Sequence, residues 1–125
     1  MSNKILMKEF EIWMQKAEQE LDTAKYNLDG SQFSASLFFS QQAAEKALKA
    51  LYIKINKELL KTHDLALLAK KLRAPKDIEQ LCKSLSPAYQ STRYPDIVQK
   101  EDRGEEAKEL IKSAEEIVVW VKKKL

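Results

Sequence analysis

Residues 41–51 read QQAAEKALKAL. Their alanines and leucines recur at spacings of three and four, which indicates an α-helix with an apolar body. When residues 33–55 are plotted at helical steps, a broad apolar arc emerges, as expected for the central helix of a bundle. This arc comprises Phe33, Leu37, Ala44, Ala47, Leu48, Leu51 and Ile55. The opposite side carries a polar stripe that comprises Gln41, Gln42, Glu45, Lys46 and Lys49, interleaved with Phe38, Tyr52 and Ile53.

The flanking sequence predicts further helices around this one. An apolar stripe predicts a first helix from about Lys4 to Asp29, ended by Gly30 in the left-handed conformation. The second helix then begins at Ser31 or Gln32. Leucines after residue 64 and apolar residues after residue 77 predict two short helices. Their expected N-terminal signals are Thr62 or Asp64 for the third helix and Pro75 for the fourth.

A long last helix is predicted from about Gly104 to Lys124. Val119 and Trp120 lie off its apolar seam, so we expect this helix to make contacts on a second face. Since no stretch alternates with the period of a strand, residues 1–125 are expected to form one all-α domain. The architecture predicted is an antiparallel up-and-down helical bundle of four to five helices.

Composition excludes several classes of function. The single Cys82 cannot form an internal disulfide, and the apolar run 117–121 is too short to span a bilayer. With no visible signal peptide, the chain is expected to be cytoplasmic and not to act on membranes. One histidine and one cysteine cannot build a zinc site, and the two glycines cannot form a phosphate loop. We therefore expect no metal and no cofactor.

Charge gives little indication of a partner. The chain has 22 basic and 19 acidic residues, a net charge of +3, which is low for a dedicated nucleic-acid binder. Three lysines at 122–124 close the last helix, where cations complement the helix dipole. The dipole interpretation is favoured, and an RNA or membrane patch is the alternative.

The segment at 38–51, followed by His63-Asp64-Leu65 and then by Arg93-Tyr94-Pro95-Asp96, resembles the HEPN domain family of prokaryotes. The resemblance covers nearly the whole chain. It implies an antiparallel helical bundle, commonly a homodimer, often encoded beside a minimal nucleotidyltransferase as a toxin–antitoxin pair. It also implies a link to nucleotides or RNA, because the family was named for proposed nucleotide binding and many members are metal-independent ribonucleases.

The ribonuclease motif of the family is absent. It consists of an arginine, four to six intervening residues and then a histidine at the start of the last helix, whereas the positions where this histidine would follow Arg93 hold Val98, Gln99 and Lys100. His63 is the only histidine in the chain. It could meet Arg93 in space, as a general base beside a cation that stabilises the phosphorane. A local role at the start of the third helix is favoured, because a histidine without an orienting partner is a poor catalytic signature.

The Arg93 segment allows two interpretations. Arg93 could clasp Glu45 or Asp96 within the chain, which is favoured, or it could bind a phosphate while Tyr94 stacks on a base. In the second case Lys46 and Lys49 would supply further donors. The polar stripe itself is then a solvated face, a subunit contact or a ligand cleft shared with the Arg93 loop.

The leading hypothesis is a HEPN-like homodimeric binding module paired with a nucleotidyltransferase, and the absence of the ribonuclease motif favours binding over enzymatic activity. Its nucleotide or RNA site would use Gln42, Lys46, Lys49, Arg93, Tyr94 and Asp96. The alternatives are a metal-independent ribonuclease that uses His63 and Arg93, and a purely structural dimer that buries Val119 and Trp120.

Overall fold

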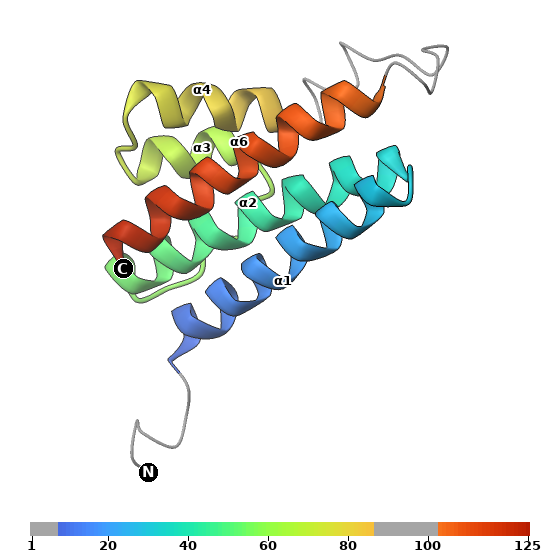
Figure 1. Cartoon of the computed structure of the whole chain (residues 1–125). Coiled ribbons are helices and arrows are strands. Elements are labelled where there is room, and N and C mark those ends of the chain that lie inside the picture. The colour runs from blue at the N-terminus through green and yellow to red at the C-terminus, as the bar shows by residue number, and fades with distance from the viewer. Residues whose placement is uncertain (1–7, 87–102) are drawn as a thin grey trace.

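The computed structural model describes residues 8–86 and 103–125, and in these parts of the chain five α-helices form an antiparallel bundle (Figure 1). The helices are α1 (Glu9–Asp29), α2 (Phe33–Asn56), α3 (Leu65–Lys71), α4 (Lys76–Leu85) and α6 (Arg103–Lys124). The described residues contain no strand. The predicted all-α fold is therefore confirmed.

Helix α2 lies at the centre of the bundle. It forms an antiparallel hairpin with α1 and also packs against α6 and α3, while α4 covers α3 and α6 (Figure 1). Half of its residues are buried, among them the fully covered Leu48 and Ala47. The expected central position follows from this apolar surface. One member of the predicted arc is wrong, because Ile55 is 60% exposed in the last turn.

Small residues bring α1 and α2 close together. Ala17, Ala24 and Ala43 are completely buried, and the equally buried Ser36 donates from Oγ to the carbonyl oxygen of Ala24 at 2.9 Å. Alanine and serine leave room for the two backbones, and the hydroxyl gains a partner that a buried polar group requires. The position of the polar stripe of α2 is therefore fixed by the packing of α2 against α1.

The first helix differs from the prediction at both ends. It begins at Glu9 and not near Lys4, because Lys8 is extended (φ −61°, ψ 142°) and its N–H donates to the side chain of Glu11 at 3.1 Å. At the other end Gly30 is not left-handed, with φ −89°. The left-handed residue is Ser31, with φ 59°.

Two backbone bonds explain this position. The N–H of Ser31 donates to Leu28 and the N–H of Gln32 donates to Asn27, at 2.9 and 2.8 Å. This is the Schellman pattern, in which the residue after the cap is left-handed. Helix α2 accordingly starts at Phe33, one to two residues later than predicted.

The short helices agree with the predicted signals. The Asp64 side chain caps α3 by accepting from the N–H of Leu67 at 3.1 Å, and Pro75 precedes α4. On α6, Trp120 is half-buried against a groove that Ile78 and Leu81 of α4 also line. The expected second contact face of α6 is therefore present, although Val119 stays 49% exposed. None of the described helices is long and apolar enough to cross a membrane.

Candidate functional site

The polar stripe of α2 is only partly open to solvent. Gln41 and Gln42 are half-buried, whereas Glu45 and Lys49 are 6% and 5% exposed. A solvated face does not bury two opposite charges. That interpretation of the stripe is therefore wrong for Glu45 and Lys49.

Glu45 and Lys49 form a buried ion pair one helical turn apart. Lys49 Nζ lies 2.8 Å from Glu45 Oε2 and 5.6 Å from the centre of the Trp13 ring, which comes from α1. A cation over an indole face is stabilised by the ring quadrupole. Lys49 is thus held between a carboxylate and an aromatic face, and its charge is already compensated.

The other stripe lysine is also engaged. Lys46 pairs with Glu20 of α1, and both side chains are largely covered. The sequence suggested Lys46 and Lys49 as phosphate donors, but the structure gives each of them an internal carboxylate. Gln42 has a different place, because it lines a pocket.

His63 has a partner that sequence reasoning missed. Its Nδ1 lies 2.9 Å from Glu45 Oε2, so the contact spans 18 residues and is not local to the start of α3. Because the carboxylate of Glu45 can only accept, Nδ1 is the donor of this bond, and in the neutral form of the ring Nε2 is the nitrogen with a free lone pair. The side chain of His63 is 85% exposed, so this second nitrogen is accessible. The signal available in the sequence was Glu45 itself, the single acidic residue of α2.

A pocket of about 380 Å³ opens at this position. Its lining combines α2 with the start of α3 and comprises Phe38, Gln41, Gln42, Glu45, His63 and Leu65. The Phe38 ring is 52% exposed and rests edge-on against Phe39, with ring centres 5.2 Å apart. The pocket therefore offers an aromatic face, two amides and an oriented imidazole within one small volume.

The remaining predicted site residues, Arg93, Tyr94 and Asp96, lie outside the described residues. No group of three or more His, Cys, Asp and Glu side chains suited to a metal occurs in residues 8–86 and 103–125. The pocket at α2 is thus the part of the expected site whose geometry is known.

The family follows from comparison with known proteins. A family model for the HEPN domain matches residues 10–124, nearly the whole chain. The chain belongs to the HEPN domain family. The resemblance based on residues 38–51, His63 and the Arg93 segment is therefore confirmed at the level of the family.

Two solved structures are similar to this HEPN chain. One is the crystal structure of an archaeal HEPN homologue, with 32% identity, coverage of 94% of this chain and 98% of the other, and a TM-score of 0.75. The other is a protein of Thermus thermophilus, with 28% identity, coverage of 95% and 100%, and a TM-score of 0.81. A comparison with curated proteins gives no match.

Proposed function

We propose that this HEPN chain is a binding module whose pocket at Phe38, Gln42 and His63 accepts the base of a nucleotide or of an RNA residue. The observation that supports this most directly is the exposed Phe38 ring beside the two glutamine amides. A base presents a flat π surface and an edge of donors and acceptors. An aromatic ring and a carboxamide, which both donates and accepts, match these two features.

The charges around the pocket favour a base over a phosphate. Within the described lining the charged carboxylate is Glu45, and its nearest cation, Lys49, is already paired with it. A phosphate is usually bound by Lys or Arg donors, and neither residue type is among the described residues that line this pocket. Arg93 remains the predicted source of a phosphate contact.

Calorimetric titration with the four common nucleosides and their 5′-monophosphates tests this proposal. Phe38→Ala should weaken binding by roughly 5- to 150-fold, since stacking on one aromatic side chain contributes about 1–3 kcal/mol. Tyr26→Ala is a matched control, because Tyr26 is a 79% exposed aromatic residue on α1 outside this pocket. An equal loss in both variants, or no binding of any nucleoside to the wild type, would overturn the proposal.

The bond between Glu45 and His63 favours a second candidate, a metal-independent ribonuclease. A carboxylate that orients an imidazole leaves Nε2 able to take a proton from a 2′-hydroxyl. Cleavage of RNA would then persist in EDTA and disappear in His63→Ala and Arg93→Ala. Cleavage that either variant retains would contradict this role.

Family membership supports two partners for the binding module, a second copy of the chain and a nucleotidyltransferase that completes a toxin–antitoxin-type pair. Size-exclusion chromatography with light scattering measures the first. If a nucleotidyltransferase is encoded beside the chain, mixing the two purified proteins tests the second. A monomeric elution profile would contradict the homodimer. The absence of a mixed peak would contradict the pairing with a nucleotidyltransferase.

A further inference from the structure

One end of the bundle is strongly basic. The segments 54–61, 70–77 and 122–125 contain ten Lys and Arg residues against two acidic ones, although the whole chain has a net charge of only +3. The ten are Lys54, Lys57, Lys61, Lys70, Lys71, Arg73, Lys76, Lys122, Lys123 and Lys124. The positive charge of the protein is therefore concentrated and not spread evenly.

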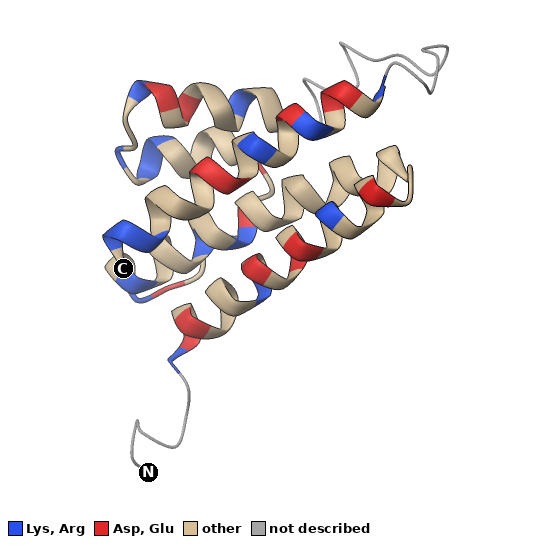
Figure 2. Ribbon diagram, in the orientation of Figure 1, with Lys and Arg blue, Asp and Glu red and all other residues tan. Residues whose placement is uncertain are grey.

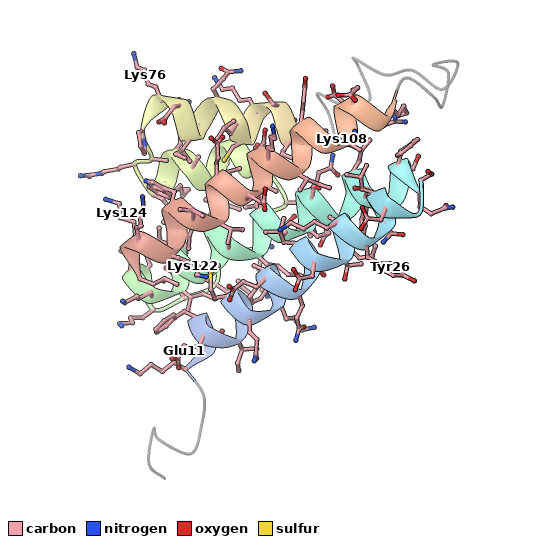
Figure 3. All side chains as sticks on the ribbon, viewed as in Figure 1. Glu11, Tyr26, Lys76, Lys108, Lys122 and Lys124 are labelled. Carbon is pink, nitrogen blue, oxygen red and sulfur yellow. The ribbon has the colours of Figure 1, made fainter. Side chains whose placement is uncertain are left out.

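These segments meet in space. Helices α2, α3 and α6 end on this side and α4 begins here, and Figure 2 shows blue segments on all four, with the acidic first turn of α1 (Glu9 and Glu11) beside them in red. Lys54 bonds to the backbone oxygen of Leu125, which joins the ends of α2 and α6. Lys123 lines the same groove as Asp77 of α4. Figure 3 places Lys76, Lys122 and Lys124 at this end and Lys108 at the other end of α6.

Most of these cations have no anionic partner among residues 8–86 and 103–125. Lys122 pairs with Glu18 at 2.8 Å, and Lys54 is held by Leu125. The other eight form no ion pair with the described residues, and Lys124 Nζ stands 6.0 Å from the centre of the Trp120 ring. Their mutual repulsion is therefore not relieved within this part of the protein.

The helix dipoles explain only some of the cations. Lys70, Lys71 and the lysines at 122–124 occupy last turns, where a positive charge is favourable. Lys57, Lys61 and Arg73 follow the helices, and Lys76 is the first residue of α4, where a cation opposes the dipole. Helix dipoles can therefore account for the lysines at 122–124 but not for all the cations at the basic end of the bundle.

We propose that this basic end binds the phosphate backbone of a nucleic-acid strand without reading its sequence. Lysine carries its charge on a flexible stem, so lysines on several helix ends suit phosphates at variable positions. A protein partner would require an apolar centre, but Ile55 is the only large apolar side chain of these segments that is strongly exposed. The inference goes beyond the base pocket and does not depend on it.

The test is the salt dependence of binding to a fluorescent single-stranded oligonucleotide, measured by anisotropy between about 50 and 200 mM salt. Lys70→Gln with Lys71→Gln and Lys123→Gln removes three exposed cations of this end. Lys16→Gln with Lys83→Gln and Lys112→Gln changes the net charge equally, and it removes three exposed cations elsewhere that form no ion pair within the described part of the chain. Circular dichroism checks that both triple variants fold.

The first triple variant should make the negative slope of log affinity against log salt shallower by about 2, at about 0.7 for each lost phosphate contact, and the second should leave the slope unchanged. An equal effect of both triple variants, or no binding of the wild type, would overturn the proposal. Tighter binding to polyglutamate or to anionic vesicles would overturn it too. Phe38→Ala should leave the slope unchanged, so the basic end and the pocket can fail independently.

Discussion

Glu45 on α2 accepts a hydrogen bond from Nδ1 of His63 at 2.9 Å while Lys49 Nζ approaches the same oxygen at 2.8 Å. One buried carboxylate therefore joins a buried cation to an exposed imidazole. The side-chain exposures rise from 6% and 8% for Lys49 and Glu45 to 85% for His63. Glu45 thus contributes both to the stability of the fold, through Lys49, and to the orientation of His63 in the pocket. Substitutions at Glu45 and at His63 can distinguish these two contributions.

Glu45→Gln should lower the free energy of unfolding by about 3 kcal/mol. It leaves Lys49 buried without a negative partner, and breaking a buried pair by removing one member typically costs about 3–5 kcal/mol. Urea denaturation measures the loss. The matched control is Glu105→Gln on α6, whose pair with Lys108 at 3.5 Å is exposed and should contribute less than about 1 kcal/mol.

A second comparison distinguishes pairing from packing. Glu45→Leu combined with Lys49→Met removes both charges together, and it should recover most of the stability lost in Glu45→Gln. Equal losses in Glu45→Gln and Glu105→Gln would contradict the assignment of a buried pair to Glu45.

His63→Ala should change the free energy of unfolding by less than about 1 kcal/mol, because the imidazole is largely exposed and Lys49 still compensates Glu45. Its effect on the pocket should be larger, since the ring lines it. Nucleoside affinity and urea denaturation, measured on the same variant, check both. A loss of stability as great as that of Glu45→Gln would show that His63 is a structural residue.

The fold could be predicted because apolar spacing alone places each helix. The seam of α6 and the body of α2 follow directly from residues three and four apart. Helix ends were less predictable, because they depend on single hydrogen bonds. Lys8 starts α1 through a bond to Glu11, and no pattern in the first seven residues indicates that limit.

The candidate site could be predicted only in part. The polar stripe was visible, but whether a charge is covered depends on the helix packed against it, and the pairing of Lys49 with Trp13 of α1 is such a contact. The partner of His63 was missed for the same reason, since 18 residues separate it from Glu45. The predicted roles of Arg93, Tyr94 and Asp96 concern residues outside the described part of the chain.

At the end of α1, introducing a glycine at Ser31 and removing the glycine at Gly30 should both stabilise the protein. Ser31→Gly should raise the free energy of unfolding by about 1 kcal/mol, because a serine in the left-handed region carries a steric cost that glycine lacks. Gly30→Ala should raise it by roughly 0.4–1 kcal/mol, because φ is −89° and an added Cβ would come no closer than 3.8 Å to the carbonyl oxygens of Asn27 and Tyr26.

Thermal or urea denaturation of the two single variants measures these changes. A marked loss of stability in Gly30→Ala, with no gain in Ser31→Gly, would place the left-handed residue at Gly30 after all.

The protein should lose stability in alkaline solution because the thiol of Cys82 is buried. Burial, with a smaller contribution from the charge of Glu79, raises the pKa of the Cys82 thiol from 9.0 to about 12. Between these values the unfolded chain releases the thiol proton and the folded chain keeps it, so stability falls as pH rises. The contribution of the buried thiol to the free energy of unfolding is fully present below about pH 9, and about 1.4 kcal/mol of it should be lost at about pH 10.

Urea denaturation at about pH 8 and about pH 10 measures this loss, with Cys82→Ala as the control because other groups also titrate in that range. Removal of the sulfur lowers stability at both pH values through the space it leaves, but it should make the fall between them smaller by the thiol contribution. A thiol reagent at the lower pH should react with the wild type only as fast as the protein opens, since Cys82 is completely buried. An identical fall in both proteins, or rapid labelling of the folded chain, would contradict the burial of this thiol.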